Sequence, residues 1–435
     1  MKSSRWFGLA LAGILASVPL AASDQIPAKK QDHPIALTGA TIYPVSGPAI
    51  PNGSILFDKG VIVAVGSSIP YPEGTEVIDI TGKHVFPGLI SSDTEIGLVE
   101  IGAVRATRDQ SETGRINPNV RAQAAFNPES EIIPVTRANG ITMFVTAPSG
   151  GLISGTSAIM LSDGWTWEDM TFKAPAALVV NWPRMTISTA PWIRQSEEEQ
   201  KKEIAKQLEE LNEALRDARS YKQAREADAK LPVDIRWEAM LPFLAGDAPV
   251  MILANEIQQI QAAVAWGAAE GLRIIIAGGT DAWRAADLLK KHDIPVITGG
   301  IQKLPSRRFD AYDEPFVLPM KLHEAGIRFA ITTGGGAAHE RSLPYHAATA
   351  AAYGLPADEA LRAITLSPAE IFGIADRVGS LDPGKDATMI VTSGDPLEIM
   401  TAVEMEFIQG RNIDLTSRHT TLNDKYIEKY SRSGE

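Results

Sequence analysis

The central part of the chain alternates short apolar runs with stretches of helical periodicity. The apolar runs lie at residues 85–90, 141–146, 157–161, 177–181, 250–254, 273–277, 295–298 and 328–332. Near-continuous apolar runs are typical of strands that are buried on both faces of a parallel sheet. Between several of the runs, apolar residues recur every three or four positions, as on one face of a helix. Eight strand–helix units predict the α/β class, as a (β/α)8 TIM barrel over residues 84–383.

The two ends of the chain have a different pattern. Residues 35–80 consist of short β-branched runs broken by Gly, Pro and Asn-Gly, and similar runs return at residues 387–391 and 403–409. This pattern predicts short antiparallel strands. We expect the segments 35–83 and 384–412 to complete one small β-sandwich domain into which the barrel is inserted. Residues 24–34 are expected to be a linker and residues 413–435 a C-terminal tail.

A charged helix is predicted from Ser196 to about Lys230. Its apolar residues follow spacings of four and three, at Ile204, Leu208, Leu211, Leu215 and Ala218. Such spacing places them on one face. A surface helix packed on the barrel explains this pattern, and a lid or a subunit contact explains it as well, because the helix lies between the fourth and fifth strands.

The first residues resemble an export signal. Lys2 and Arg5 precede an apolar stretch at 6–18, and small residues at 21–23 suit cleavage. We therefore predict a signal peptide at residues 1–23 and a periplasmic location if the source is a Gram-negative bacterium. No later segment is long and apolar enough to predict a membrane span.

The amino-acid composition excludes several kinds of site and partner. The chain of 435 residues is 44% hydrophobic and 22% charged, as in ordinary globular proteins, and it has no cysteine. Disulfides, thiolate metal sites and thiol nucleophiles are therefore excluded. The formal net charge is −12, without a run rich in Lys and Arg, which argues against a nucleic-acid partner. We expect a small-molecule or peptide-like substrate, and homo- and hetero-oligomers both stay open.

Motifs at both ends of the barrel carry a family resemblance. The run Pro87-Gly88-Leu89-Ile90 leads into the first strand, and Ser367-Pro368-Ala369, Gly379-Ser380-Leu381, Pro383-Gly384-Lys385 and Asp395-Pro396 follow the last. In order and spacing these motifs resemble the amidohydrolase superfamily, most closely its imidazolonepropionase-like branch, over residues 35 to about 411. The resemblance implies hydrolysis of C–N bonds with one or two divalent metals at the C-terminal mouth of a barrel.

The residues expected to bind those metals differ from the family pattern. Family members use two His on strand one, often a Lys on strand four, a His each on strands five and six, and an Asp on strand eight. Here the corresponding positions hold Asp93, Glu95, Val179, Leu253, Gly278 and Gly334. The usual metal centre cannot be built from these side chains, so the resemblance implies a degenerate metal site and no metal ligand is assigned.

Three residues are candidates for catalysis. Asp93 and Glu95 are two carboxylates on one strand face, and His339 is expected on the loop after strand eight. The carboxylates can act as a general acid and base, or they can hold a hard divalent cation such as Mg²⁺, Ca²⁺ or Mn²⁺. His339 can contact a ligand or can make a local hydrogen bond within its loop.

Four arginines are candidates for binding a substrate carboxylate. Arg105 and Arg108 lie in the loop after strand one, Arg307 follows strand seven and Arg341 follows strand eight. Guanidinium groups suit carboxylates because they bind them through two parallel hydrogen bonds. Ion pairs within the loops are the alternative explanation.

Two functions remain open from the sequence. One is a hydrolase of C–N bonds in an amide or small peptide, with a rearranged active site. The other is a non-catalytic relative that binds a ligand or supports a competent paralogue. The fold is the same in both, because function depends on the site and not on the scaffold.

Overall fold

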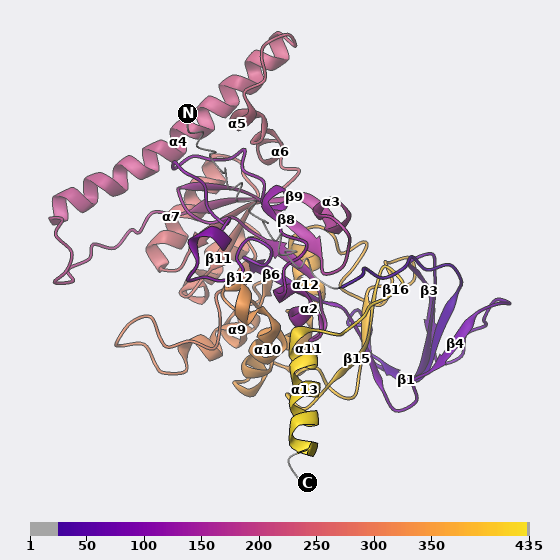
Figure 1. Ribbon diagram of the computed structural model, residues 1–435. Coiled ribbons are helices and arrows are strands. Elements are labelled where there is room, and N and C mark those ends of the chain that lie inside the picture. Colours follow the sequence, from indigo (N-terminus) through magenta and orange to yellow (C-terminus); the bar gives the residue numbers. More distant parts are fainter. Residues whose placement is uncertain (1–24, 433–435) are drawn as a thin grey trace, which may run out of the picture.

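The computed structural model describes residues 25–432, and the predicted signal peptide lies outside the described residues. Strands from both ends of the chain form one sheet at the side of the molecule (Figure 1). They are β1 Ile35–Ile42, β2 Ile50–Asp58, β3 Val61–Gly66, β4 Glu76–Asp79, β5 His84–Pro87, β14 Met389–Thr392, β15 Val403–Ile408 and β16 Arg411–Asn412. The small β-domain predicted from the two chain ends is therefore present.

The order of this sheet is β16-β15-β14-β5-β1-β2-β3, with β4 paired to β1. Strand β5 lies in its centre, between β14 from the C-terminal segment and β1. The small domain has its own apolar core, in which Phe57 and Phe407 meet edge to face. The barrel accordingly begins at β6, a few residues later than the predicted boundary at residue 84.

A second sheet of eight strands curves around the centre of the molecule in the order β13-β12-β11-β10-β9-β8-β7-β6. Its strands are β6 Leu89–Thr94, β7 Ile141–Thr146, β8 Ile153–Leu161, β9 Thr171–Asn181, β10 Val250–Ala254, β11 Ile274–Gly278, β12 Val296–Thr298 and β13 Phe329–Ala330. An isolated bridge between Thr94 and Gly335 joins the two edges at one end, so the barrel is nearly closed. The predicted α/β barrel is confirmed.

One strand runs against the others, contrary to the expectation of a wholly parallel barrel. β8 pairs antiparallel with both β7 and β9. The connections into and out of β8, residues 147–152 and 162–170, are short. A parallel crossover needs roughly a dozen residues or more, whereas an antiparallel neighbour needs only a turn. The segment 162–170 has room for a single short helix, and it cannot carry a parallel crossover.

Helices cover the outside of the barrel (Figure 1). The helices are η1 Arg105–Thr107, α1 Ala122–Ala125, α2 Ile132–Arg137, α3 Trp167–Met170, α4 Glu197–Ala227, α5 Ile235–Glu238, α6 Leu241–Leu244, α7 Ile257–Ala269, η2 Ala282–Ala285, α8 Ala286–Lys291, α9 Glu314–Glu324, η3 Ala337–Ser342, α10 Leu343–Ala352, α11 Ala357–Arg362, α12 Leu366–Ile371 and α13 Arg418–Arg432. One apolar cluster fills the layer between strands and helices, and a second lies inside the barrel.

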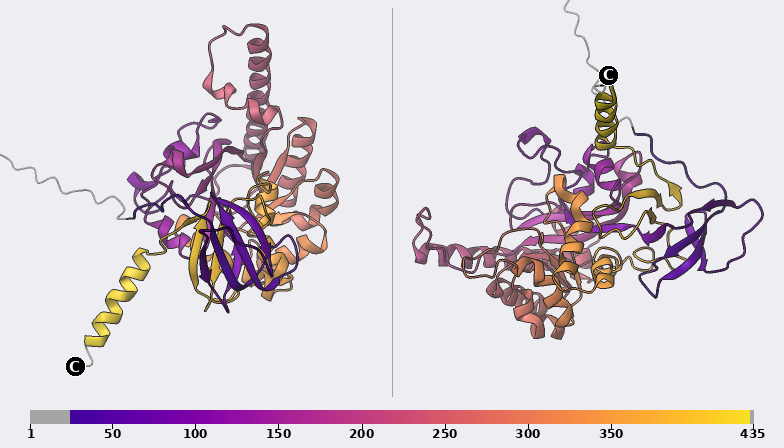
Figure 2. Two further views of the ribbon diagram at one scale, coloured as in Figure 1. Left: turned by 90° about the vertical axis from the view of Figure 1, so that its right-hand side faces the viewer. Right: turned by 90° about the horizontal axis from the view of Figure 1, so that it is seen from below.

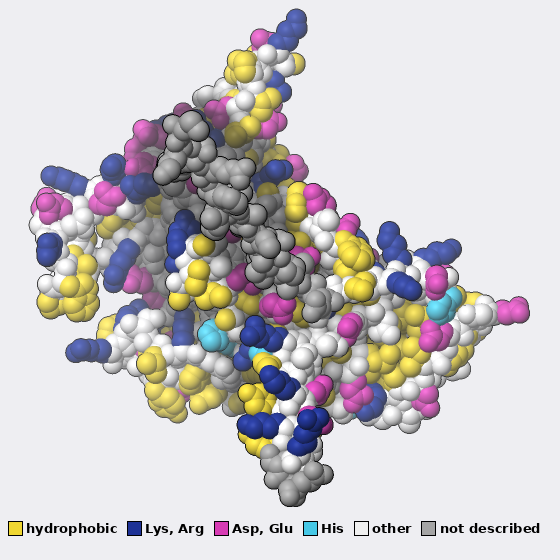
Figure 3. Space-filling view, in the orientation of Figure 1, with side chains coloured by type: hydrophobic (Ala, Val, Ile, Leu, Met, Phe, Trp, Pro, Cys, Tyr) yellow, Lys and Arg dark blue, Asp and Glu magenta, His cyan; other side chains and the backbone are white. Residues whose placement is uncertain are grey.

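Helices α4 and α13 project from the body (Figure 2). The predicted charged helix is confirmed as α4, which begins after a capping box formed by Ser196 and Glu199. Its buried residues, including Leu211 and Leu215, lie on the predicted face. The predicted tail contains α13, none of whose residues is buried, and its Lys and Arg side chains are visible on the face shown in Figure 3. Within residues 25–432, no helix combines the length and apolarity needed to cross a bilayer.

Candidate functional site

A bulge at the end of β6 brings Asp93 to the interior side of the barrel mouth. Ser91 pairs with Phe144 and Thr94 pairs with Thr146, so two residues, Ser92 and Asp93, lie opposite the single residue Val145. Val145 belongs to the apolar cluster inside the barrel. In a bulge of this kind the extra residue locally bends the strand and redirects its side chains. Because β6 ends here, Asp93 lies at the face where barrel enzymes carry their active sites.

The carboxyl groups of Glu95 and Glu340 act on that of Asp93 at this position. Burial, assisted by the nearby Glu340 and Glu95 carboxyls, raises the pKa of Asp93 to about 7. Burial also raises the pKa of Glu95, whose Oε1 accepts a hydrogen bond from the Ser149 hydroxyl at 3.3 Å. Asp93 can therefore exchange a proton near neutral pH, which is the property required of a general base or acid.

Glu340 was not identified from the sequence. It is fully buried, and its carboxyl accepts hydrogen bonds from Ser91 at 2.6 Å and from Thr333 at 2.9 Å. These bonds connect η3 to β6 and to the segment after β13. Ala337 and Glu340 are the two buried residues of η3, three positions apart, which fits the three-residue turn of a 3₁₀ helix. The sequence carried no sign that this loop would form such a helix.

The neighbours of Glu340 in sequence have different positions. His339 is exposed, so its predicted contact with a ligand stays a prediction. The Arg341 carbonyl accepts a hydrogen bond from Asn139, in the turn that enters β7 at the end of that strand away from the mouth. The Arg341 side chain is exposed, and its predicted role in substrate binding stays a prediction.

Arg108 and Arg105 remain near the mouth, in the loop that follows β6. Both side chains are exposed. The positive charge of Arg108 opposes the rise in the pKa of Glu95, so this guanidinium lies close to the carboxyl pair. The Gln110 amide, oriented so that its oxygen faces Arg108, accepts hydrogen bonds from Nη2 at 2.9 Å and from Nε at 3.2 Å. Arg105 donates to the Arg108 carbonyl at 3.0 Å. Substrate binding by these two residues stays a prediction.

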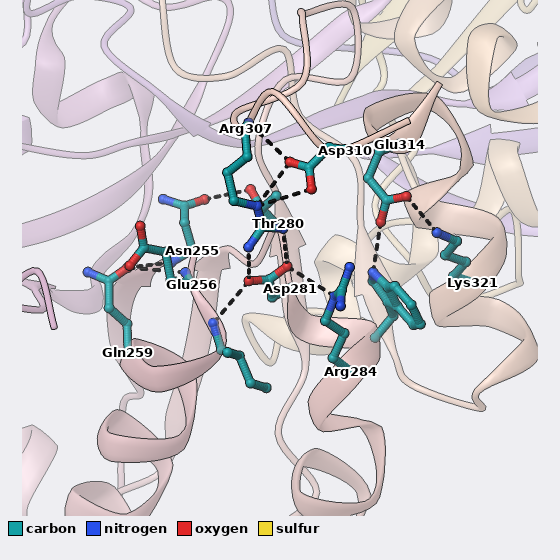
Figure 4. Close-up of polar contacts among 12 residues, drawn as sticks. Asn255, Glu256, Gln259, Thr280, Asp281, Arg284, Arg307, Asp310, Glu314 and Lys321 are labelled. Carbon is teal, nitrogen blue, oxygen red and sulfur yellow. Dashed lines mark hydrogen bonds and ion pairs between the residues drawn. The ribbon is translucent and has the colours of Figure 1, made fainter. Parts of the chain in front are cut away.

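Arg307 is held in an internal ion-pair network, as in the alternative explanation offered for the arginines (Figure 4). Its Nη1 and Nη2 donate to the two oxygens of Asp281 at 2.9 and 2.7 Å, and its Nε donates to Asp310 at about 3.0 Å. Asp281 is 1% exposed and also pairs with Arg284 at 3.3 Å. All three guanidinium nitrogens donate, so Arg307 fixes the loop after β12 to the loop after β11. A contact with substrate stays a prediction.

The residues at the mouth do not fit the metal centre that the family resemblance implies. Val179 on β9 and Leu253 on β10 have hydrocarbon side chains, and Gly278 and Gly334 have none. At the family positions only Asp93 on β6 and Glu95 just after it carry oxygen ligands, and the nearby Glu340 carboxyl is bound to Ser91 and Thr333. Two ligands are fewer than a structural or catalytic divalent metal takes from a protein. Among residues 25–432, no group of three or more His, Asp or Glu side chains is arranged to hold an ion.

A cavity of about 640 Å³ lies elsewhere, between the small β-domain and α11. Tyr43, Phe86, Leu361 and Leu397 are among its lining residues. It is next to β5 and therefore on the side of the barrel opposite the mouth. The mouth is the candidate site, because it combines ionisable groups with shifted pKa values.

Comparisons with known proteins agree with this architecture. The sequence profile described as the amidohydrolase family matches residues 316–416. The amidohydrolase tasK of Hapsidospora irregularis is 22% identical over 394 residues, which are 82% of this chain and 39% of that protein. The chain thus spans about two fifths of this relative.

Solved structures extend the similarity over most of the chain. A crystal structure of an amidohydrolase from Thermotoga maritima is 25% identical and has a TM-score of 0.77, with 87% of this chain and 99% of that chain covered. An adenosine deaminase from Xanthomonas campestris with bound zinc is 16% identical, with a TM-score of 0.52 over 93% of this chain and all of that one. The barrel with its composite β-domain is the fold shared by these structures. The chain belongs to the amidohydrolase superfamily.

Proposed function

We propose that the protein hydrolyses an amide-type C–N bond at the mouth of its barrel, with Asp93 as the general base. The observation that carries this proposal is the inward position of Asp93 together with its pKa of about 7. Superfamily membership supports a hydrolase. Among the structural relatives are a prolidase complexed with N-methylphosphonate-L-proline and a phenylurea hydrolase.

The proposed reaction uses groups of this chain. Ionised Asp93 removes a proton from a water molecule while the water oxygen attacks the carbonyl carbon. Asp93, now protonated, gives that proton to the leaving nitrogen as the C–N bond breaks, and the products are a carboxylic acid and an amine. Positioned proton transfer of this kind contributes roughly 10² to 10⁴ in rate. Glu95 and Glu340 support it by favouring the protonated form of Asp93 near neutral pH.

The test is hydrolysis of a panel of N-acyl amino acids, dipeptides and cyclic amides. We expect kcat/KM to rise with pH up to about 7 and then to level, because the base must be ionised. Asp93→Asn should lower kcat by at least about 100-fold. Asp424→Asn, an exposed change on α13, is the matched control and should leave kcat unchanged. Full activity in Asp93→Asn would contradict the proposal.

A second candidate is a non-catalytic relative that binds a ligand or supports a paralogue. The hydrocarbon side chains of Val179 and Leu253 at family ligand positions favour it. The two candidates differ in one outcome. Binding of panel members without turnover at any pH between 5 and 9 would support the non-catalytic protein and would end the hydrolase proposal.

A further inference from the structure

Helix α13 is fixed to the protein at its first residues and exposed along its whole length. Ile413 belongs to the apolar cluster inside the barrel, and Ser417 is 4% exposed. The Ser417 amide donates to the Thr420 hydroxyl at 2.9 Å, and the Thr420 amide donates to the Ser417 hydroxyl at 3.4 Å, which caps the start of the helix. Beyond this start α13 projects from the body (Figure 2).

An apolar row runs along the exposed helix. Leu422, Tyr426 and Tyr430 follow one another at intervals of four, so they lie on one side. Ile427, three positions before Tyr430, widens this row. The four side chains are between 39% and 68% exposed. A surface helix of a globular protein normally turns such a row toward the core. Here no part of residues 25–432 covers it, so the row is available to a partner.

A basic row runs beside the apolar row. Leu422 lies three positions before one lysine and seven before another, and both intervals place residues on neighbouring parts of the helix surface. The Nζ atom of Lys429 is 5.6 Å from the ring centre of Tyr426 and 5.5 Å from that of Tyr430. The whole row follows intervals of seven, four and three and consists of Arg418, Lys425, Lys429 and Arg432.

The two acidic residues of α13 lie on the opposite side. Glu428 is two positions from both Tyr426 and Tyr430, which turns it about 200° away from them around the helix. Asp424 is four positions before Glu428 and shares its side. An apolar side bordered by Lys and Arg, with the acids turned away, is typical of helices that lie in the surface of a bilayer. The lysine stems then extend along the apolar surface to the lipid phosphates.

The acidic body does not cancel the charge of this helix. The chain has a formal net charge of −12, whereas α13 contains four basic and two acidic residues. Its 15 residues extend about 22 Å. Exposed charges more than about 8 Å apart are largely screened at physiological salt. Lys425, Lys429 and Arg432 belong to the outer half of the helix, so a surface that meets this half encounters mainly positive charge.

We propose that α13 binds the surface of a bilayer that contains anionic phospholipids. Its apolar row inserts at the level of the headgroups, and its basic row contacts the lipid phosphates. The contact is peripheral, because 15 residues are fewer than the roughly 20 that a helix needs to cross the hydrocarbon core. This inference goes beyond the proposed hydrolysis and does not depend on it.

A fluorescent label on α13 tests the contact, because the chain has no cysteine and one introduced cysteine is labelled alone. Asn423→Cys puts the label on the apolar side, since Asn423 lies four positions before Ile427 and seven before Tyr430. Glu428→Cys puts it on the opposite side. Each labelled full-length protein is titrated with vesicles of phosphatidylcholine, alone or mixed three to one with phosphatidylglycerol.

The two labels should respond differently to the anionic vesicles. Emission from Asn423→Cys should shift to the blue and should be quenched by brominated lipid, whereas emission from Glu428→Cys should stay as in water. Vesicles of phosphatidylcholine alone should bind at least about tenfold more weakly, because each basic residue near an anionic surface contributes about fivefold.

Charge variants are compared in the protein labelled at Asn423→Cys. Lys425→Gln/Lys429→Gln should weaken binding to the anionic vesicles about 25-fold, or about fivefold for each charge. The matched control is Lys290→Gln/Lys291→Gln, which removes two exposed lysines from α8 and changes the net charge equally. It should leave the affinity unchanged.

An apolar variant completes the test. Ile427→Ser/Tyr430→Ser should weaken binding at least about tenfold, since it removes inserted apolar area. Absence of a blue shift with anionic vesicles, equal affinity for neutral vesicles, or equal losses in the α8 and α13 charge variants would overturn the inference. A dimer that forms without lipid and is lost in Ile427→Ser/Tyr430→Ser, with no response to vesicles, would assign the apolar row to a second copy of the chain instead.

Discussion

At the scale of single residues, the chain also buries carboxyl groups away from the mouth. One of them is Glu406 on β15, which is fully buried and whose two oxygens have no hydrogen-bond partner in the described chain. Burial raises the pKa of Glu406 to about 8, opposed by the charge of Arg137 and assisted by that of Asp163. Glu406 is therefore protonated in the folded protein at neutral pH.

This burial predicts a specific pH dependence of stability. The pKa of Glu406 in the folded protein lies above its ordinary value. Its burial therefore does not lower the free energy of unfolding below about pH 4, and it lowers that free energy increasingly as the pH rises to about 8. In Glu406→Gln, the loss in free energy of unfolding between pH 5 and pH 9 should be smaller than in the wild-type protein by at least about 1 kcal/mol. Urea denaturation at the two pH values measures this difference.

Glu404→Gln is the matched control for this measurement. Glu404 lies on the same strand, but it is part of an exposed ion pair with Lys83. Its loss should change the free energy of unfolding by no more than about 1 kcal/mol. Identical pH dependence in the wild-type protein and Glu406→Gln would show that Glu406 is already ionised or is hydrated in the folded state.

The positions of some of these carboxyl groups could be predicted from the sequence, and those of others could not, for physical reasons. Asp93 and Glu95 could be assigned to the mouth because their strand is marked by flanking motifs. Glu340 follows strand β13, in a segment whose shape depends on tertiary contacts such as the hydrogen bond to Ser91. Strand alternation alone would turn Glu406 outward, away from Phe407, but the side of β15 that carries Glu406 is covered by other parts of the chain.

At the scale of elements, loop-to-loop ion pairs fix the active face. Arg307 connects the loop after β12 to Asp281 after β11. Arg307→Ala would leave Asp281 buried with only Arg284 as a charged partner. We expect the free energy of unfolding to fall by about 2 to 3 kcal/mol, somewhat below the usual cost of breaking a buried pair because Arg307 is 28% exposed.

Arg308→Ala provides the control, since its side chain is exposed and adjacent in sequence. It should leave the unfolding free energy within about 0.5 kcal/mol of wild type. Urea denaturation of both variants measures these changes in the free energy of unfolding. Unchanged stability of Arg307→Ala, together with weaker binding of a carboxylate ligand, would contradict the structural role and support the predicted contact of Arg307 with substrate.

The elements themselves were well marked in the sequence. Strands β7 and β10 were predicted to the residue, because each is an uninterrupted apolar run next to a Gly or Pro signal. The capping box at Ser196 and the apolar spacing along α4 gave its start and its buried face. The direction of β8 was predicted wrongly, since apolar periodicity is the same in parallel and antiparallel strands and only the connection lengths distinguish them.

At the scale of the whole molecule, the amidohydrolase scaffold is present while the positions at which the family resemblance implies metal ligands carry other side chains. The barrel and the composite β-domain match an amidohydrolase of Thermotoga maritima over nearly its whole length. The side chains at those positions, however, are two carboxylates, hydrocarbons and glycines in place of His, Lys and Asp. The account therefore assigns proton transfer to Asp93, a group of this chain.

The most direct test of this account is the metal content of the protein after exposure to zinc. The full chain is incubated with a molar excess of Zn²⁺, dialysed, and analysed by mass spectrometry of the elements, with hydrolysis assayed before and after a chelator. The account predicts far less than one ion per chain and turnover that the chelator leaves unchanged. One or two retained zinc ions per chain, with activity lost on chelation and restored by zinc, would contradict it.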